Sequence, residues 1–505
     1  MDHEENVTAD FASRPTGRRA ASAASEGSRE GAPGGFTPHG GGAGDSPSGG
    51  LSGKRILVVG LGKSGIAAAR LLMRQGARVV LNDRRTDVEG LEPLVALGAD
   101  PQLGHHDAAL FTSVDAIVLS PGVPPLPALD AADAAGIPVW SEIELAARFL
   151  SGCTVVGITG TNGKSTVTSL IGAMAAKSGR PTFVGGNLGI PFVDVVGTDA
   201  AGPDGFVVVE LSSFQLERVD TFRANVALLL NITEDHLDRY PGMAEYAAAK
   251  ARIFHGQHKE DHAIVPAGDE VCASLARAGA AKVHRYAGFT SGGENPKPEV
   301  CVVGDALVDQ KSGLRFPIAE LKIRGGHNLA NAASAMLAAR LAGIGEDAIV
   351  QTLRTFAGLP HRMFFVRERG GVRFYDDSKA TNVGATVAAL EGFRTDPSFT
   401  GKVVLLAGGK DKGGSYAPMV DALRAVGRTV VTLGEAAPLI EAALHDVPFE
   451  RAPSFDDAVV RAAALAKPGD AVVLAPACSS FDMFRSYAER GERFQRAVLA
   501  LPEVG

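Results

Sequence analysis

The stretch Val155-Val-Gly-Ile-Thr-Gly-Thr-Asn-Gly-Lys-Ser-Thr166 runs from an apolar, β-branched segment into a glycine-rich turn that ends in a lysine and two hydroxyl residues. Residues 167–177, which follow, are compatible with a helix. A strand, a loop and a helix N-terminus in this order direct backbone N–H groups and the positive end of the helix dipole at an anion. We therefore expect a loop that binds nucleotide phosphates, made of Gly160, Thr161, Asn162, Gly163, Lys164, Ser165 and Thr166.

The spacing of this loop departs from the strict P-loop pattern. That pattern places a glycine five residues before Gly163, where this chain has Ile158. In the expected geometry Lys164 reaches the β- and γ-phosphates, and the hydroxyl of Ser165 or Thr166 holds Mg²⁺. The alternative is an ordinary tight turn, which the strand-like run before the loop disfavours.

Length and composition are those of a multidomain globular protein. The 505 residues suffice for about three domains. The chain is 45% hydrophobic and 21% charged with a net charge of −7, and no basic tract suggests nucleic acid as a partner. Its four cysteines are scattered, which suits a reducing cytoplasm, and no apolar run reaches the ~18 residues of a membrane helix. We expect a cytoplasmic monomer without membrane insertion.

Residues 1–53 are rich in Ala, Gly, Ser and Pro. Such a composition buries too little apolar surface to offset the entropy lost on ordering. It also lacks the apolar segment of a secretory signal. We therefore expect a disordered tail without a role in the chemistry.

A dinucleotide-type fingerprint opens the part of the chain that we expect to fold. A strand predicted at 55–59 is followed by Gly60-Leu-Gly-Lys-Ser-Gly65, a helix, a second strand at 78–81 and Asp83. This pattern binds a diphosphate at the helix N-terminus and a ribose or base through the acid. NAD(P), another nucleotide diphosphate and structural packing alone are all open readings. A third strand, at 115–119, ends in the loop Ser120-Pro-Gly122.

Two apolar runs in the middle of the chain end in candidate metal-binding residues. Residues 206–209 lead to Glu210, and an acid at this place beside a phosphate loop suits a metal ligand. The alternative is an acid that caps a helix. Residues 226–230 lead into Asn231–Asp238, which holds three acids and His236 within five residues. This density indicates a metal or phosphate site, although a lone histidine is more often structural.

Two further segments carry polar residues on predicted helices. Residues 243–254 form a predicted helix that includes Lys250, and composition alone does not distinguish this lysine from a solvated charge. Gly325-Gly-His-Asn-Leu-Ala-Asn331 leads into an alanine-rich helix. Asn328 and Asn331 are three residues apart and share a helix face. They could cap this helix or hold a nucleotide base.

The last part of the chain begins near Phe356-Ala-Gly-Leu-Pro360. Strands are predicted at 372–375, 403–407, 429–433 and 471–474, with helical segments between them. This alternation predicts another parallel α/β sheet. Polar loops at 376–382, 408–412 and 475–482 fall at strand carboxyl ends, where such sheets bind ligands.

Seven motifs in this order make the chain from about Lys54 onward resemble the Mur ligases of peptidoglycan precursor synthesis, and among them the ligases that add D-glutamate. They are Gly157–Thr166, Glu210–Glu217, Thr233–Pro241, His327-Asn328, Leu359–Arg362, Asp377–Asn382 and Pro476–Asp482. The resemblance implies an α/β fold of three domains. These are a Rossmann-like UDP-binding domain at 54–145, a central P-loop ATPase-like parallel-sheet domain at 146–357 and a C-terminal Rossmann-like domain at 358–505, which binds the amino acid.

The resemblance also implies roles for individual residues. In this family the first domain binds the UDP part of the substrate rather than NAD(P), here through Gly62, Ser64, Gly65, Asp83, Arg84, Ser120 and Gly122, with Asn187 at the acyl end. ATP would contact the phosphate loop, Asn331, Arg362 and Asp377. D-glutamate would contact Thr381, Lys412, Ser480 and Phe481. Mg²⁺ would be held by Ser165, Glu210, His236 and Lys250 as N6-carboxylysine (a carbamate). Lys164, His236, Lys250 and Lys379 would be catalytic.

The implied reaction is the ATP-dependent addition of D-glutamate to UDP-N-acetylmuramoyl-L-alanine through an acyl phosphate. Three other readings stay open. The chain could be a sibling Mur ligase or a folylpolyglutamate-type ligase, which would share the ATP loop. It could be an NAD(P)-dependent oxidoreductase built on Gly60–Gly65, or a nucleotide-binding protein without catalysis.

Overall fold

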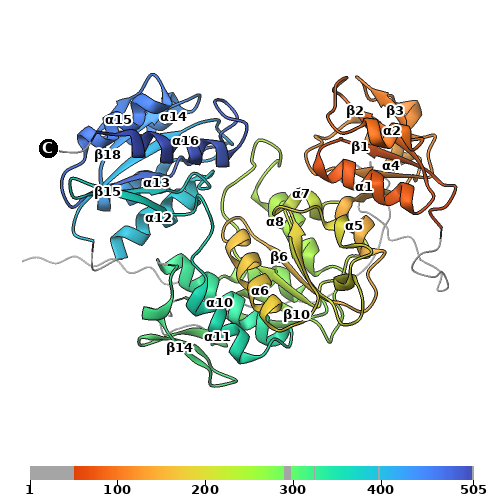
Figure 1. Cartoon of the computed structure of the whole chain (residues 1–505), viewed down its shortest axis with the longest axis horizontal. Helices are drawn as coiled ribbons and strands as arrows, with labels where there is room; N and C mark the ends of the chain where they lie inside the picture. Colours follow the sequence, from red (N-terminus) through yellow and green to blue (C-terminus); the bar gives the residue numbers. More distant parts are fainter. Residues whose placement is uncertain (1–49, 289–296, 324, 396–398, 503–505) are drawn as a thin grey trace, which may run out of the picture. The chain divides into compact units, whose positions relative to one another are not determined.

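The computed structural model describes residues 50–288, 297–323, 325–395 and 399–502. In these ranges three sheets follow one another along the sequence, each accompanied by helices (Figure 1). The tail predicted at 1–49 lies outside the described residues. Residues 50–53 are ordered, contrary to prediction, because Leu51 packs on the first core and the Gly53 N–H donates to the carbonyl of Gly76 at 2.8 Å.

The first sheet contains five parallel strands. They are β1 (Arg55–Val59), β2 (Arg78–Asp83), β3 (Asp100–Leu103), β4 (Ala116–Leu119) and β5 (Val139–Ser141). The accompanying helices are α1 (Lys63–Arg74), α2 (Glu92–Ala96), α3 (Ala108–Phe111), α4 (Pro127–Ala134) and α5 (Glu142–Ala147). The strand order is β3-β2-β1-β4-β5, so the order reverses between β1 and β4. Open α/β sheets bind ligands at this point.

The second sheet contains nine strands. They are β6 (Thr154–Thr159), β7 (Thr182–Gly186), β8 (Phe206–Glu210), β9 (Val226–Leu229), β10 (His262–Pro266), β11 (Lys282–Tyr286), β12 (Val300–Val303), β13 (Ala306–Asp309) and β14 (Arg315–Pro317). The order is β14-β13-β12-β11-β10-β9-β6-β8-β7. The pairs from β7 to β12 are parallel, as predicted, but β13 and β14 pair antiparallel.

Helices of the second sheet begin directly after several of its strands. They are α6 (Lys164–Lys177), α7 (Ser213–Leu216), α8 (Met243–Ala251), α9 (Glu270–Arg277), α10 (Gly326–Leu341) and α11 (Glu346–Thr355), with 3₁₀ turns η1 (Phe192–Val195), η2 (Asp199–Ala201), η3 (Arg252–Phe254) and η4 (Ile318–Glu320). The predicted helix at 243–254 is therefore α8 followed by η3. Gly325 is the N-cap of α10, so the capping alternative for Asn328 and Asn331 is wrong.

The third sheet has the order β15-β16-β20-β17-β18-β19. Its strands are β15 (Phe364–Arg369), β16 (Val372–Asp376), β17 (Val403–Gly408), β18 (Gly427–Leu433), β19 (Phe449–Arg451) and β20 (Ala471–Leu474). Its helices are α12 (Val383–Thr395), α13 (Ala417–Val426), α14 (Ala437–Leu444), α15 (Phe455–Leu465) and α16 (Tyr487–Ala500). The four predicted strands are present, and the sheet is parallel except for β15, an antiparallel edge strand that was not predicted.

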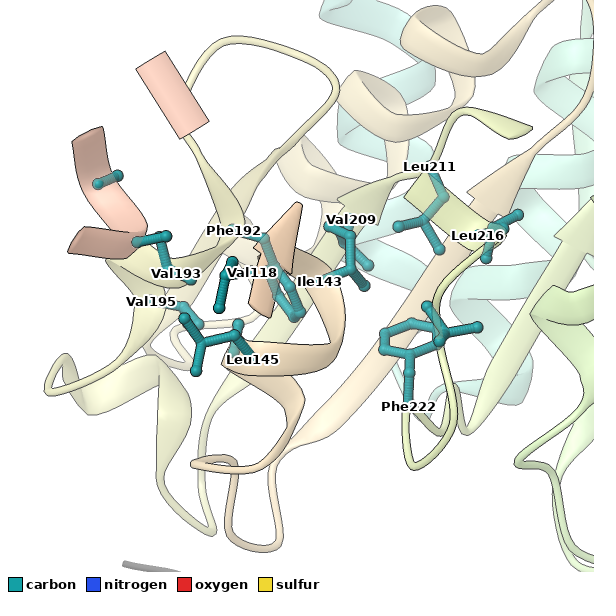
Figure 2. Packing of buried hydrophobic residues seen from close by; sticks show 14 of the residues in the cluster. Val118, Ile143, Leu145, Phe192, Val193, Val195, Val209, Leu211, Leu216 and Phe222 are labelled. Atoms are coloured by element: carbon teal, nitrogen blue, oxygen red, sulfur yellow. The ribbon is translucent and has the colours of Figure 1, made fainter. Parts of the chain in front are cut away.

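One apolar cluster joins the first sheet to the second. Figure 2 shows Val118 of β4, Ile143 of α5 and Phe192 of η1 in this cluster, together with Val209 of β8. All four side chains are buried. Burial of apolar surface contributes roughly 25 cal/mol per Å². This shared core packs α5, which follows the first sheet, against η1 of the second sheet.

Candidate active site

The phosphate loop, Glu210 and the 231–238 segment meet because β6 lies between β8 and β9. Ile158 of β6 is in register with Glu210 of β8, and Thr159 is in register with Leu229 of β9. Parallel strands end at the same sheet edge, so the three segments emerge side by side. The adjacency predicted from the sequence is thereby present in the fold.

Asn231 holds the phosphate loop in shape, a role that the sequence did not reveal. Its Oδ1 accepts from the Asn162 N–H at 2.8 Å, and its Nδ2 donates to the Asn162 carbonyl at 3.1 Å. Gly163 has φ 86°, and a β-carbon there would lie 2.5 Å from Asn331 Oδ1. Only glycine therefore allows this turn, which brings Asn331 of α10 against the loop. Asn331 Nδ2 donates to Asn328 Oδ1 at 3.1 Å, so the two residues share a face as predicted.

Two lysines converge on one backbone carbonyl of the loop. Lys164 Nζ donates to the Gly160 carbonyl at 2.7 Å, and Lys250 Nζ donates to the same oxygen at 2.8 Å. Burial lowers the pKa of Lys164. Burial and the charge of Lys164 hold the pKa of Lys250 well below its usual range. Lys250 is 1% exposed, so the solvated-charge reading of this lysine is wrong.

Tyr246 links the helix of Lys250 to the phosphate loop. It lies one turn before Lys250 on α8, and the ammonium group sits 4.5 Å from the centre of its ring. The Tyr246 hydroxyl and Thr161 Oγ1 are 3.2 Å apart. The ring is buried, and burial raises the pKa of its hydroxyl. Sequence reasoning missed Tyr246, although its spacing of four from Lys250 puts both on one helix face.

Glu210 presents a buried carboxylate oxygen toward this edge. Its Oε1 accepts from Asn187 Nδ2 at 2.7 Å, while Oε2 is buried without a hydrogen-bond partner among the described residues. The capping alternative is wrong, because α7 is capped by Ser212 in a capping box with Gln215. A buried carboxylate oxygen left without a donor suits a hard cation such as Mg²⁺.

The few protein donors in this region suit a magnesium ion that is held mainly by phosphates and water. The described residues contain no group of three His, Cys, Asp or Glu side chains that could hold a metal by itself. Mg²⁺ is commonly bound by one or two carboxylates together with substrate phosphates. The donors present here, Glu210 and the Ser165 hydroxyl on the phosphate loop, fit that mode of binding.

His236 projects from a strained position in the 231–238 segment. Its φ of 58° is uncommon for a residue with a side chain. The imidazole Nε2 lies 3.7 Å from Asp235 Oδ2, and the ring packs 4.8 Å from that of Phe214. Burial lowers the pKa of His236 to about 4, despite the opposing charge of Asp235. The ring is therefore neutral at pH 7 and keeps a nitrogen lone pair that can accept a proton or ligate a metal.

Loops of the third sheet contact the same edge. Arg362 donates to Ser165 Oγ at 2.8 Å. Asn382 Nδ2 donates to Asp235 Oδ2 at 3.0 Å, and Lys412 Nζ donates to Asp235 Oδ1 at 3.1 Å. Burial favours the neutral acid, but Lys412, with His236 and Asn382, holds the pKa of Asp235 below its usual range. Asp235 was predicted only as one of the three acids of the 231–238 segment, and Asn382 only as part of the polar loop 376–382, without a role for either side chain.

A small polar pocket lies beside these contacts. Its lining includes Asp235, Asn382, Lys412 and Tyr416. Lys412 lines this pocket together with the acids Glu234, Asp235 and Asp411, and its predicted contact with D-glutamate stays a prediction. Among the described residues, Thr381, Ser480 and Phe481 do not line this pocket, although they were predicted to share a ligand with Lys412. Ser480 is buried and Phe481 is 70% exposed.

Two further predicted residues lie near Arg362 and are electrostatically coupled to it. Burial raises the pKa of Asp377 to about 7, which Arg362 opposes, and Asp377 Oδ1 accepts from the Met363 N–H at 3.3 Å. Burial, with the charge of Arg362, lowers the pKa of Lys379 to about 8. The Lys379 ammonium lies 3.8 Å from the centre of the Tyr487 ring.

Asp83 of the first sheet is fastened to the glycine loop by Arg85. Its Oδ2 accepts from the Leu61 N–H at 2.8 Å, and Arg85 binds both carboxylate oxygens, at 2.8 and 3.0 Å. Burial opposes ionisation, but these donors hold the pKa of Asp83 below its usual range. Arg84 and Arg85 are both exposed, so they differ in their contacts and not in burial. The sequence identified Arg84 but missed Arg85, because both arginines follow the acid and spacing cannot separate them.

The glycine loop of the first sheet combines close packing with an open edge. A β-carbon at Gly65 would lie 2.0 Å from the Gly60 carbonyl oxygen, so this glycine allows α1 to approach β1. A β-carbon at Gly62 or Gly122 would meet nothing within 4 Å. Ser120 Oγ donates to the Gly60 carbonyl at 2.6 Å, and Ser64 lies in the first turn of α1. The predicted diphosphate residues therefore gather at the carboxyl ends of β1, β2 and β4.

Family models match most of the ordered chain. Residues 54–141 match the MurD-like N-terminal domain of Mur ligases, 158–339 match the Mur ligase middle domain, and 361–478 match the Mur ligase glutamate ligase domain. A UDP-N-acetylmuramoylalanine–D-glutamate ligase from Anaeromyxobacter dehalogenans is 47% identical over 462 residues, which cover 88% of this chain and 97% of the relative. The chain belongs to the Mur ligase family.

A second relative and several solved structures agree with this assignment. The Mur ligase of the same name from Geotalea daltonii is 45% identical, with 89% of this chain and 98% of the relative covered. In fold, the chain is similar to a pseudomurein peptide ligase type C from Methanothermus fervidus (TM-score 0.58, 19% identity, 88% of this chain and 100% of that one). It is also similar to the Mur ligase MurF from Thermotoga maritima, solved with ADP (TM-score 0.55, 17% identity, 90% and 96% covered).

These matches favour a Mur ligase over an oxidoreductase built on the first glycine loop, since that loop lies within the MurD-like match. The fold class predicted from the sequence is confirmed: three α/β regions, with the phosphate loop in the second. No helix in the described ranges is long and apolar enough to cross a membrane.

Proposed function

We propose that the chain is an ADP-forming ligase that uses ATP to join D-glutamate to UDP-N-acetylmuramoyl-L-alanine in peptidoglycan precursor synthesis. The observation that carries this proposal is the 47% identity to a ligase of that name across 97% of the relative's length. The convergence of Lys164, Glu210 and Arg362 on one phosphate loop supports the use of ATP.

The reaction requires a carboxylate to become an electrophile. An amine cannot expel oxide from a carboxylate, so the γ-phosphoryl group of ATP is first transferred to the L-alanyl carboxylate. The amine of D-glutamate attacks the carbonyl carbon of this acyl phosphate and loses a proton. The tetrahedral intermediate then collapses to an amide and inorganic phosphate. The protein contributes positioning and neutralisation of negative charge.

The phosphates of ATP would lie against residues 160–166. The loop N–H groups and Lys164 would bind the phosphates, and Arg362, which contacts Ser165 Oγ, would add a second cation. Asn331 lies against Gly163 from α10 and would contact the nucleotide together with Asp377. Lys379, whose pKa is lowered to about 8 by burial, keeps its charge at pH 7 and would lie near the transferred group.

Magnesium would be held by Ser165 and Glu210, with a second ion at His236. A bound Mg²⁺ neutralises the charge that develops on the phosphoryl oxygens. The buried Oε2 of Glu210 and the neutral imidazole of His236 are the groups of this chain that fit such ions.

Lys250 would act as a carbamate. Burial and the charge of Lys164 lower the pKa of Lys250 and so favour its neutral amine, whose lone pair would attack the carbon of CO₂. The nitrogen then releases a proton, and the product is N6-carboxylysine. The modification converts a cation into an anion that can ligate magnesium, which would also end the repulsion between Lys250 and Lys164.

The two remaining substrates would contact mainly loops of the first sheet and loops of the third sheet. The UDP group would contact Gly62, Ser64, Gly65, Asp83, Arg84, Ser120 and Gly122, and Asn187 beside Glu210 would contact the acyl end. D-glutamate would contact Thr381, Lys412, Ser480 and Phe481, with Lys412 paired to a carboxylate. We further propose domains at 54–145, 146–357 and 358–505, and a cytoplasmic monomer.

Phosphate release tests the proposed function. The purified protein, ATP and Mg²⁺ would be mixed with UDP-N-acetylmuramoyl-L-alanine, and D-glutamate, L-glutamate, L-lysine and meso-diaminopimelate offered one at a time. We expect release with D-glutamate alone. Release with another amino acid would make the chain a sibling ligase. No release with any amino acid would refute the ligase activity.

A further inference from the structure

Arg239 bridges the His236 segment and the first sheet. It follows His236 by three residues, and its N–H donates to the His236 carbonyl at 3.0 Å. One guanidinium nitrogen donates to the Val123 carbonyl at 3.0 Å, and another binds Glu217 Oε2 at 2.9 Å. The Arg239 side chain is 18% exposed. Arg239 is thus a partly buried cation that binds Val123 in a loop of the first sheet and Glu217 in a loop of the second sheet.

The Arg239 guanidinium is held on a small aromatic cluster. It lies 4.2 Å from the centre of the Phe214 ring. The Phe214 ring also contacts the rings of His236 and Tyr240, with ring centres 4.8 and 5.9 Å apart. The Tyr240 hydroxyl donates to Glu217 Oε1 at 2.5 Å. Planar guanidinium groups stack on aromatic faces while donating in their own plane, which a lysine cannot reproduce. The cluster therefore connects the orientation of Arg239 to that of His236.

The Val123 end of the bridge leads to the glycine loop. The Val123 N–H donates to the Ser120 carbonyl at 3.2 Å, closing the turn Ser120–Val123. Ser120 Oγ donates to the Gly60 carbonyl at 2.6 Å. A β-carbon at Gly60 would lie 2.5 Å from Val123 Cγ2, so the valine packs directly on this glycine. A displacement of Val123 would consequently move both loops at the edge of the first sheet.

We propose that Arg239 is a positioning residue that couples the nucleotide-sugar loops of the first sheet to the His236 segment. This inference rests on the proposed function, because it takes the Ser120–Val123 turn and the Gly60 loop as the site of the UDP group. Binding of that group holds the turn in place, and the Val123 carbonyl then holds Arg239, Phe214 and His236 in one arrangement. Loss of the guanidinium breaks this connection without touching the phosphate loop.

Arg239→Met is the main test variant, because methionine keeps an unbranched apolar stem on Phe214 and removes the donors. Arg218→Met is the matched control. Arg218 forms a bidentate ion pair with Asp133 of α4, at 2.8 and 2.9 Å, and so also joins the two sheets, but within the described residues its guanidinium makes no hydrogen bond to a site loop. Arg239→Lys keeps the charge and loses the planar fork.

Binding and kinetics of the full-length enzyme separate coupling from a merely structural role. We expect Arg239→Met to raise the Kd and KM for UDP-N-acetylmuramoyl-L-alanine about tenfold or more, the scale of a lost charged hydrogen bond. The Kd for ADP and the KM for D-glutamate should stay within about twofold. Arg239→Lys should recover part of the loss, and Arg218→Met should match the wild type.

The outcomes that would overturn the inference are distinct from failure of the proposed function. Unchanged nucleotide-sugar affinity in Arg239→Met would refute the coupling. Equal loss of affinity for all three ligands, with a lowered Tm, would make Arg239 a structural residue and also refute it. A wild type that binds the nucleotide sugar but releases no phosphate would refute the ligase activity. The Kd values of the Arg239 variants for the nucleotide sugar could still be compared with that of the wild type. A wild type that does not bind it would overturn both.

Discussion

Lys250 has its ammonium group inside the protein, between the ring of Tyr246 and the carbonyl of Gly160. Lys164 donates to the same carbonyl. Two cationic groups that share one oxygen repel each other, and burial adds to the cost of the charge on each. Conversion of Lys250 to a carbamate would replace this repulsion by attraction. The fold therefore shows a physical reason for modification of Lys250. The sequence pattern of its helix does not show this reason.

Replacement of Lys250 by alanine should lower kcat by about 10- to 100-fold, the scale for lost groups of a metal site. Acetate or propionate should restore part of the activity, because a short carboxylate fits the space left by the side chain. Lys250→Arg is the control that cannot form a carbamate and leaves no such space. Full activity of Lys250→Ala would contradict the carbamate role.

The contact between α1 and β1 shows how one glycine sets the distance between elements. At Gly65 a β-carbon would lie 2.0 Å from the Gly60 carbonyl, whereas at Gly62, with φ −83°, it would meet nothing within 4 Å. Gly65 thus serves helix packing, while Gly62 leaves the backbone at the helix N-terminus open. The fingerprint combines a packing role and a ligand role, which are separable by mutation.

Gly65→Ala should destabilise the protein by about 1–3 kcal/mol, because overpacking forces α1 away from β1. Its Tm should therefore fall by several degrees. Gly62→Ala should leave the Tm unchanged and weaken UDP binding, since its methyl group would stand where a diphosphate approaches. Thermal unfolding and titration with UDP check both variants. Equal Tm values for the two variants would contradict the packing role of Gly65.

Local patterns were sufficient to predict the apolar strands that lead into site loops. β1, β6 and β8 are apolar runs that enter glycine-rich or acidic turns, and such signals lie within a few residues. Ten other strands were not predicted: β3, β5, β7, β10 to β15 and β19. Among them, β14 and β15 are short or half-exposed, and their strand character arises from antiparallel pairing rather than from local periodicity.

At the scale of the whole molecule, the active-site region is assembled by contacts between distant segments. Asp235 accepts hydrogen bonds from Asn382 and Lys412, which follow it in the sequence by 147 and 177 residues. Arg362 donates to Ser165, which precedes it by 197 residues. Sequence reasoning predicted Lys412 and Arg362 through the family resemblance. It placed Asp235 and Asn382 in candidate site segments but predicted neither their contacts nor the role of Arg85, because these depend on partners that only the fold brings near.

The sheet arrangement explains why the reaction can be confined. The phosphate loop lies at the carboxyl edge of the second sheet, with contacts from the third sheet on Ser165 and Asp235 and from the first sheet through Arg239. An acyl phosphate is hydrolysed by water, so enclosure between loops of several sheets protects it. An acyl phosphate forms and breaks only if one oxygen passes from the substrate carboxylate to phosphate, and this transfer is the central claim.

Oxygen-18 transfer from the L-alanyl carboxylate tests that claim most directly. UDP-N-acetylmuramoyl-L-alanine with both carboxylate oxygens labelled would be incubated with ATP, Mg²⁺ and D-glutamate, and the released phosphate analysed by mass spectrometry. We predict one labelled oxygen in each phosphate and one retained in the new amide. Unlabelled phosphate formed together with the amide would contradict the acyl-phosphate route.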